Sequence, residues 1–279
     1  MSEAPAAREL GATAGATPQI QVQALKHRYR TGDGGYVDAL DDVSFAVSAG
    51  EVLTVVGPSG CGKSTLVHLI AGLIPPLAGT MLVDGLAVRG PGPDRGVVFQ
   101  ELAILPWRTV RGNICHGLEI ARRPRRERDR IVDEYVDLVG LRGFESRYPH
   151  ELSGGMKQRV AVARTLAADP KVILMDEPFA AVDAQTRITL QEELLRISTV
   201  TSKTILFVTH SVDEATFLGD RVMVLTRRPG RVKTIVDVPV PRVARSWDAL
   251  SHDRLYLEVR ETVMRLVRGE IKDAGPGTG

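Results

Sequence analysis

Gly57-Pro58-Ser59-Gly60-Cys61-Gly62-Lys63-Ser64-Thr65 is the stretch of sequence that decides the fold. It matches the pattern GxxxxGK[ST], whose glycines let backbone N–H groups turn inward around phosphate oxygens. The apolar run Val52 to Val56 precedes it, and apolar residues at helical spacing follow it. This order of strand, loop and helix presents a helix N-terminus to an anion. Every residue of the stretch except Pro58 is a predicted nucleotide contact, with Lys63 on the β- and γ-phosphates and Ser64 on Mg²⁺.

Cys61 is open to two interpretations. A thiol beside a phosphate can act as a redox switch, and a small thiol can simply fill the loop. The second is favoured because the only other cysteine, Cys115, is remote in sequence. The two cysteines also lack the spacing of a zinc site or a disulfide framework, which indicates a reducing compartment.

The composition is that of an ordinary globular protein, with 43% hydrophobic and 25% charged residues in a chain of 279. A formal net charge of +2 is too small to indicate a polyanionic partner, so no nucleic acid is expected. No apolar run approaches the ~20 residues needed to cross a bilayer. We therefore expect no membrane-spanning segment.

Two kinds of strand pattern occur along the chain. Apolar and polar residues alternate from Ile20 to Leu25 and from Val43 to Val47, which predicts an antiparallel layer with one solvated face. The apolar runs Val172 to Met175 and Ile205 to Val208 are typical of buried parallel strands, and helical patterns follow both. Alternation of this kind predicts an α/β core.

The expected domain organisation has three parts. Residues 1–18 form a disordered lead-in, residues 19–240 form the main domain, and residues 241–279 form a C-terminal helix and a flexible tail. Between about 102 and 168 the strand signal disappears, which predicts an inserted helical subdomain.

An acidic pair, Asp176 and Glu177, ends the apolar run at 172–175. In α/β proteins, ligands bind at the carboxyl ends of the strands. Asp176 there would bind Mg²⁺, and Glu177 would orient or accept a proton from an attacking water. Acidic residues in this position are also common helix caps.

Two further positions are candidates for binding an anion. Ser153, Gly154 and Gly155 open an apolar-periodic helix, which predicts either a second anion site or a plain N-capped helix. His210 follows the run Ile205 to Val208 and is either a structural histidine or a phosphate contact.

Five segments, taken in order, resemble those of the ATP-binding cassette (ABC) family. They are GPSGCGKST at 57–65, Gln100 after a strand, LSGGMKQR at 152–159, VILMDEP at 172–178 and His210. The resemblance covers roughly residues 20–240. It implies an α/β fold with a P-loop NTPase (RecA-like) core, an N-terminal antiparallel β subdomain and an inserted helical subdomain. It also implies ATPase activity with ATP and Mg²⁺ as cofactors.

The resemblance assigns roles to several residues. It implies that Glu177 is the catalytic carboxylate and that His210 contacts the γ-phosphate. Gln100 would sense Mg²⁺ and the attacking water, joining Ser64 and Asp176 in the metal set.

Tyr29 matches the aromatic residue that stacks on adenine in the family. Because residues 31–35 (TGDGG) form an insertion, Tyr36 is a competitor for this role. We expect Tyr29 to hold the base.

Partners also follow from the resemblance. It implies a head-to-tail dimer with a second copy or a homologous ATPase, in which Ser153, Gly154 and Gly155 of one subunit cap the ATP of the other. Asp183 would lie in the loop that crosses this dimer. Integral-membrane permease subunits would hold the dimer at the cytoplasmic face of the inner membrane, and a substrate-binding protein would act indirectly through them.

Within the family, Leu105-Pro106-Trp107 and the run from Asp183 to Arg187 look like those of importers of nitrate, aliphatic sulfonates, taurine and bicarbonate. The alternative is an ABC ATPase of another transporter type or one that acts on DNA or the ribosome. DNA-repair relatives carry very long insertions, whereas only 52 residues separate Gln100 from Ser153 here. Ribosomal relatives carry two cassettes, and only one is visible.

An arginine cluster falls in the expected helical insertion. It could meet anionic lipid head groups, or it could form a solvated helix face with Glu127 and Asp129 between its members. We favour the solvated face. The cluster comprises Arg122, Arg123, Arg125, Arg126, Arg128 and Arg130.

Overall fold

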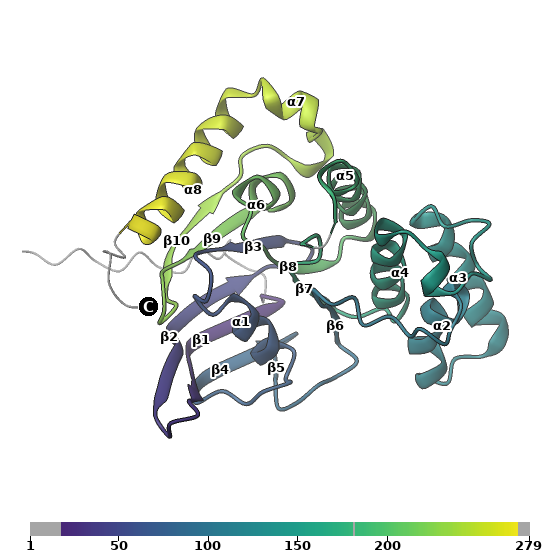
Figure 1. Ribbon diagram of the computed structural model, residues 1–279, viewed down its shortest axis with the longest axis horizontal. Coiled ribbons are helices and arrows are strands. Elements are labelled where there is room, and N and C mark those ends of the chain that lie inside the picture. The colour runs from purple at the N-terminus through teal and green to yellow at the C-terminus, as the bar shows by residue number, and fades with distance from the viewer. Residues whose placement is uncertain (1–17, 181, 273–279) are drawn as a thin grey trace, which may run out of the picture.

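The structure, a computed structural model, describes residues 18–180 and 182–272. Its core is a six-stranded sheet in the order β10-β9-β3-β8-β7-β6 (Figure 1). The strands are β3 (Val52–Val56), β6 (Arg95–Val98), β7 (Val172–Asp176), β8 (Thr204–Val208), β9 (Arg221–Leu225) and β10 (Val232–Asp237). Neighbouring strands are parallel, except that β10 is antiparallel to β9. Every residue of β3, β7 and β8 is buried, which explains their continuous apolar sequences.

A second, antiparallel sheet has the strand order β2-β1-β4-β5. Its strands are β1 (Ile20–Arg30), β2 (Tyr36–Val47), β4 (Ala78–Val83) and β5 (Leu86–Ala87). Helix α1 (Lys63–Ile70) packs between the two sheets, because its residues Leu66 and Ile70 share one core cluster with Phe45 of β2 and Leu206 of β8. The predicted fold class is therefore confirmed.

The opposite face of the core sheet is covered by helices. Along each strand, every second residue points to this face, and residues such as Phe207 of β8 and Met175 of β7 form a second core cluster with the helices. The helices are α5 (Ala184–Thr201), α6 (Val212–Leu218), α7 (Trp247–Ser251) and α8 (Arg254–Lys272), with a short 3₁₀ turn, η2 (Arg242–Ala244), before α7. In Figure 1, α8 runs along the outside of β9 and β10.

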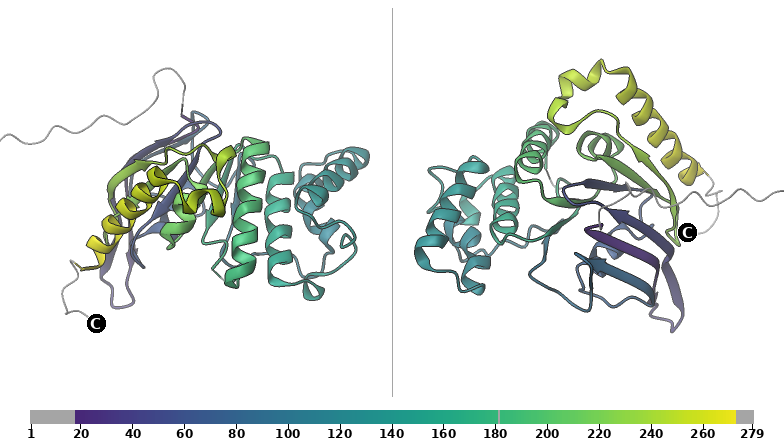
Figure 2. Two further views of the ribbon diagram at one scale, coloured as in Figure 1. Left: turned by 90° about the horizontal axis from the view of Figure 1, so that it is seen from above. Right: turned by 180° about the vertical axis from the view of Figure 1, so that it is seen from behind.

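Residues 102–168 contain helices and, within the described chain, no strand. The elements are α2 (Val110–Ile120), α3 (Arg125–Leu138), the 3₁₀ turn η1 (Pro149–Glu151) and α4 (Gly154–Ala167). Figure 2 shows them projecting together from the β6 side of the core. The predicted domain boundaries themselves remain predictions. The expected disordered lead-in, up to residue 17, and the tail from residue 273 lie outside the described residues.

The arginine cluster lies on and around α3, where acidic side chains are within reach. Arg123 pairs with Glu127 (3.3 Å), and Arg128 pairs with Glu119 (3.4 Å). Arg125 lies 3.8 Å from Asp129. These contacts favour the solvated helix face over a lipid-binding surface. Across the described ranges, no helix is both long and apolar enough to cross a membrane.

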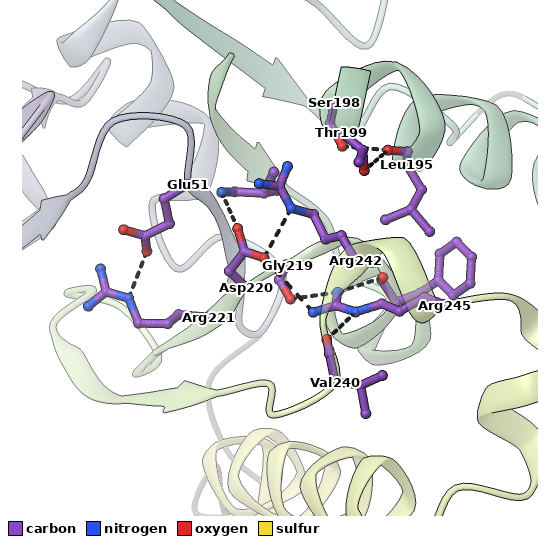
Figure 3. Close-up of polar contacts among 12 residues, drawn as sticks. Glu51, Leu195, Ser198, Thr199, Gly219, Asp220, Arg221, Val240, Arg242 and Arg245 are labelled. Carbon is purple, nitrogen blue, oxygen red and sulfur yellow. Dashed lines mark hydrogen bonds and ion pairs between the residues drawn. The ribbon is translucent and has the colours of Figure 1, made fainter. Parts of the chain in front are cut away.

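The segment after β10 is fastened to the core by a buried guanidinium (Figure 3). The side chain of Arg245 is fully buried and donates to the carbonyl oxygens of Phe217 (2.9 Å), Gly219 (2.9 Å) and Val240 (2.8 Å). Burial lowers the pKa of Arg245 to about 10, so the group is still charged at neutral pH. Three carbonyl oxygens therefore accept hydrogen bonds from one cation.

Arg245→Met is expected to destabilise the fold by about 3 kcal/mol, because it leaves those buried carbonyls without donors. For a chain of this size, that corresponds to a fall in the melting temperature of about 5 °C or more. Thermal unfolding followed by circular dichroism measures it. Arg254→Ala, which removes an exposed pair with Glu258, is the control and should change the melting temperature by less than about 2 °C. Equal melting temperatures for the two variants would contradict the anchoring role.

Candidate functional site

The phosphate-binding loop, residues 57–65, leaves the carboxyl end of β3 and enters α1. Gly62 caps α1 with a φ of 99°, a conformation that side chains disfavour. A Cβ on Gly62 would also lie 2.8 Å from the carbonyl oxygen of Ala39 and 2.5 Å from Leu40 Cδ2. The glycine is therefore required both for its conformation and for the close approach of β2.

The loop forms one wall of a cleft of about 270 Å³. The cleft is lined by Tyr29, Val37, Ala39, Ser59, Gly60, Gly62, Lys63, Ser64, Thr65, Glu177 and Arg228. Lys63 is nearly buried, and its Nζ donates to the carbonyl oxygens of Gly57 (3.0 Å) and Pro58 (3.1 Å). Its ammonium group is thereby held inside the curve of the loop, where it can neutralise a bound phosphate.

Gly57 and Cys61, two predicted contacts in the loop, do not line the cleft. Cys61 is 1% exposed, and a Cβ on Gly57 would lie only 2.9 Å from its sulfur, so the thiol packs beneath the loop. Burial raises the pKa of Cys61, which keeps the thiol protonated and unreactive. These observations favour Cys61 as a filler of the loop over a redox switch.

Of the two tyrosines considered for the base, Tyr29 lines the cleft. Its hydroxyl is 3.2 Å from Thr65 Oγ1, and it pairs across β1 and β2 with Val37, another residue of the cleft wall. The ring of Tyr36 is 64% exposed and instead lies under the guanidinium of Arg28, 5.6 Å away. The geometry favours Tyr29 for the adenine.

Two of the three predicted metal ligands, Ser64 and Asp176, come together beside the cleft. Ser64 Oγ donates to Asp176 Oδ1 at 3.0 Å, although 112 positions separate the two residues. Burial raises the pKa of Asp176, while the bond from Ser64 acts in the opposite direction. No group of three or more histidine, cysteine or acidic side chains that could hold a metal occurs in the part of the chain that the structure describes. A hydroxyl, one carboxylate and the oxygens of a nucleotide are, however, the ligands that Mg²⁺ takes beside phosphates.

Glu177 follows Asp176 in a backbone conformation with a φ of 44°, which is uncommon for a residue with a side chain. Its N–H donates to the carbonyl oxygen of Val208 (2.9 Å), which fixes this conformation. His210 Nδ1 lies 3.0 Å from Glu177 Oε2. The carboxylate therefore faces the cleft with the imidazole beside it, an arrangement suited to handling a water molecule.

Gln100 is not part of this cluster. It is exposed, does not line the cleft and has no hydrogen bond among the described residues. It does follow β6 at the same edge of the sheet, since Val98 pairs with Met175 in the strand that ends at Asp176. The sheet thus brings Gln100 to the same edge as Asp176 without placing its side chain against the metal ligands.

The Ser153 segment and Asp183 lie away from the cleft of their own chain. Ser153 caps α4 through its Oγ, which accepts from Met156 N (3.3 Å), and Gly154 faces open space. Asp183 is exposed and caps α5, where the N–H of Thr186 lowers the pKa of the carboxylate. Within one chain both therefore serve as helix caps, the alternative that the sequence left open for Ser153.

Three residues of the cleft were missed by the sequence analysis: Val37, Ala39 and Arg228. None belongs to a motif. The two β2 residues could have been found from strand alternation, because Val37 pairs directly with Tyr29 and Ala39 lies two positions further along β2, on the same face. Arg228 carries no signal in the sequence, because it reaches the cleft only through the folding of the β9–β10 hairpin.

A glycine-rich loop before a helix, a lysine within its curve and an acidic pair at the end of a parallel strand two places along the same sheet define a P-loop nucleotide-binding domain. A family model described as ABC transporter matches residues 40–180. The chain also shares 53% identity over 86% of its length with an uncharacterized ABC transporter ATP-binding protein of Methanocaldococcus jannaschii, and it covers 88% of that protein. The chain therefore belongs to the ABC transporter family as an ATP-binding protein and ATPase.

The chain is also similar to relatives that are named for the solute they import, and to a solved structure. A nitrate import ATP-binding protein of Synechococcus elongatus is 50% identical over 80% of this chain and 34% of its own length. A taurine import ATP-binding protein of Roseobacter denitrificans is 46% identical over 76% of this chain and 80% of its own. The dimeric structure of an ATP-binding cassette bound to ADP and Pi, in a post-hydrolysis state, superposes with a TM-score of 0.69 and 28% identity, covering 80% of this chain and all of that one.

Gly62→Ala is expected to weaken ATP binding about tenfold or more, because the added methyl group must displace either the loop or β2. Gly90→Ala is the matched control, since a Cβ there meets nothing within 4 Å. Titration of each variant with a fluorescent ATP analogue compares the affinities. Wild-type affinity in Gly62→Ala would show that the loop tolerates a side chain at this point.

Proposed function

We propose that the chain is the ATP-hydrolysing subunit of an importer for a small anion such as nitrate, an aliphatic sulfonate, taurine or bicarbonate. The observation that carries the proposal is the 46–50% identity with proteins named for nitrate and taurine import. In this proposal the chain is a peripheral protein on the cytoplasmic face of the inner membrane. Specificity for the anion would reside in the permease and in a substrate-binding protein.

The loop that would meet the permease is exposed but well braced. Trp107 is 71% exposed, on the segment between β6 and α2. Buried Asn113 holds this segment, because its Oδ1 accepts from Leu105 N (2.8 Å) and its Nδ2 donates to Leu105 O (3.1 Å) and Arg108 O (3.0 Å). A rigid loop that presents a large aromatic side chain is suited to receiving a helix of a permease.

ATP would be bound between two copies arranged head to tail. In each copy the cleft would hold the triphosphate through Lys63 and the loop amides, and the partner would supply the N-terminus of α4 with Ser153 and Gly155. The open space beside Gly154 supports this arrangement, since a phosphate oxygen could approach the backbone there. The dimeric cassette structures among the relatives support it as well.

In the reaction, Glu177 would accept a proton from the attacking water, and His210 would help to hold the carboxylate and the γ-phosphate in place. Ser64 and Asp176 would hold Mg²⁺, which neutralises phosphate charge when bound. Gln100 would reach the metal and the water only after its segment moves toward the cleft. These roles fit hydrolysis better than transfer to another acceptor, because Glu177 would act on a water molecule.

Closing the dimer over ATP would supply the work of transport. If ATP binds the closed form about 10⁴-fold better than the open form, it biases the equilibrium by about 5.5 kcal/mol. That bias is sufficient to switch a transporter from one access state to the other. The same closure excludes bulk water from the reacting phosphate.

Reconstitution tests the proposed function. The chain is co-expressed with the membrane protein encoded beside its gene, and the complex is placed in vesicles with the substrate-binding protein. ATPase activity is expected to rise several-fold when one of the four anions is added on the binding-protein side. Stimulation only by solute on the ATPase side would indicate an exporter, and the absence of any co-purifying membrane protein would contradict the transport function.

Glu177→Gln is expected to keep ATP affinity, lower turnover about 10²- to 10⁴-fold and trap an ATP-bound dimer, because the amide cannot accept the proton. Phosphate release and size-exclusion chromatography measure the two effects. Lys63→Ala is the comparison variant, which should instead weaken ATP binding and give no trapped dimer. Undiminished hydrolysis by Glu177→Gln would remove Glu177 from the catalytic role.

A further inference from the structure

The β9–β10 hairpin, residues 226–231, packs directly against the phosphate-binding loop. Gly230 N donates to the carbonyl oxygen of Ala39 (2.9 Å), and Asp41 N donates to that of Gly230 (3.0 Å). A Cβ on Gly230 would overlap the carbonyl oxygen of Cys61 and would lie 3.1 Å from Leu40 Cδ2. The hairpin is thus in backbone contact with both the loop and β2, and no side chain fits between them.

The rest of the hairpin is fixed as well. Thr226 N donates to Arg231 O at 2.9 Å, and Arg231 N donates to Thr226 Oγ1 at 3.0 Å, which closes its base. Arg227 N donates to Glu270 Oε2 of α8 at 3.1 Å. The backbone around residue 228 is therefore held by bonds to β2 on one side and to α8 on the other.

Arg228 lies on this hairpin and lines the nucleotide cleft together with Tyr29 and Ser59. It forms no hydrogen bond or ion pair with any residue that the structure describes. By contrast, the guanidinium of Arg231, in the same hairpin, pairs with Asp41. A guanidinium without a carboxylate partner on the wall of an anion-binding cleft is available for a ligand oxygen.

We propose that Arg228 binds the phosphate of ATP nearest the ribose, the α-phosphate, as a second cation beside Lys63. The position of Arg228 in the cleft indicates which phosphate it would bind. The hairpin is attached to β2, the strand that pairs with β1 where Tyr29 would hold the base. Lys63 and the Ser64–Asp176 pair lie on the loop and β7, at the end where the terminal phosphates would bind. The inference rests on the proposed roles of Tyr29 and Lys63.

Arg228→Gln tests the inference. Affinities for ATP, ADP and adenosine are measured by displacement of a fluorescent nucleotide at low and at high ionic strength. ATP and ADP are each expected to bind about tenfold more weakly at low salt, while adenosine is unchanged, since only the phosphate contact is lost. The difference should shrink at high salt because this cation is exposed to solvent. Arg228→Lys should recover part of the affinity by keeping the charge.

Arg227→Gln is the matched control, because Arg227 is the neighbour of Arg228 in the chain but its side chain does not line the cleft. The substitution keeps the bond from the backbone N–H of residue 227 to Glu270. Its ATP affinity and its melting temperature should equal those of the wild type. An equal loss for adenosine would overturn the phosphate contact and place Arg228 on the base or ribose. If Lys63→Ala weakens ATP binding and Arg228→Gln does not, the role of Arg228 alone is wrong. If neither variant weakens it, the assignment of the cleft to ATP fails.

Discussion

The backbone of the phosphate-binding loop is held at a three-way contact that admits no side chain. Gly62 approaches the Ala39–Leu40 segment of β2, and Gly230 of the β9–β10 hairpin approaches Cys61 from another direction. Hydrogen bonds between Gly230 and both Ala39 and Asp41 close the triangle. Because these contacts and hydrogen bonds leave no room between the three segments, they restrict how far the curvature of the loop can change. The pocket for phosphate is therefore built into the packing of two sheets.

This contact explains why a cleft of modest size receives residues from the whole length of the chain. The antiparallel sheet contributes Tyr29, the start of α1 contributes Lys63, the residue after β7 contributes Glu177, and the β9–β10 hairpin contributes Arg228. Each element is fixed against the loop by main-chain contacts or by its place in a sheet. The buried cation of Arg245 has a similar effect further out, since it ties the chain beyond β10 to carbonyl oxygens at the C-terminal end of α6.

The sequence predicted those parts of the site that lie where parallel α/β sheets generally bind ligands, at the carboxyl ends of the strands. Loops that follow neighbouring strands meet at one sheet edge, so Ser64, Asp176, Glu177 and His210 could be assembled from their positions after apolar runs. The preference for Tyr29 over Tyr36 came from the family resemblance, and the register of β1 with β2, which the insertion at 31–35 obscures in the sequence, supports it by pairing Tyr29 with Val37 of the cleft wall. Arg228 could not be predicted, because its place depends on a hairpin docking onto a strand about 190 positions earlier. The cap role of Ser153 within one chain was visible in the sequence, and that of Asp183 appeared only in the structure. The proposed roles of both residues between chains depend on a surface that one chain does not contain.

Packing between α4 and α5 links the two segments that would act across a dimer. A Cβ on Gly155 would lie 2.7 Å from Thr186 Cγ2, in the first turn of α5, and Thr186 N is the donor that Asp183 accepts. The start of α4 is therefore packed closely against the start of α5, so that a shift of one would press on the other. In the proposed head-to-tail dimer, a subunit that delivers Ser153 to its partner's ATP must bring Asp183 to the interface in the same movement. Contact of Ser153 with the γ-phosphate and arrival of Asp183 at the dimer interface would then occur together.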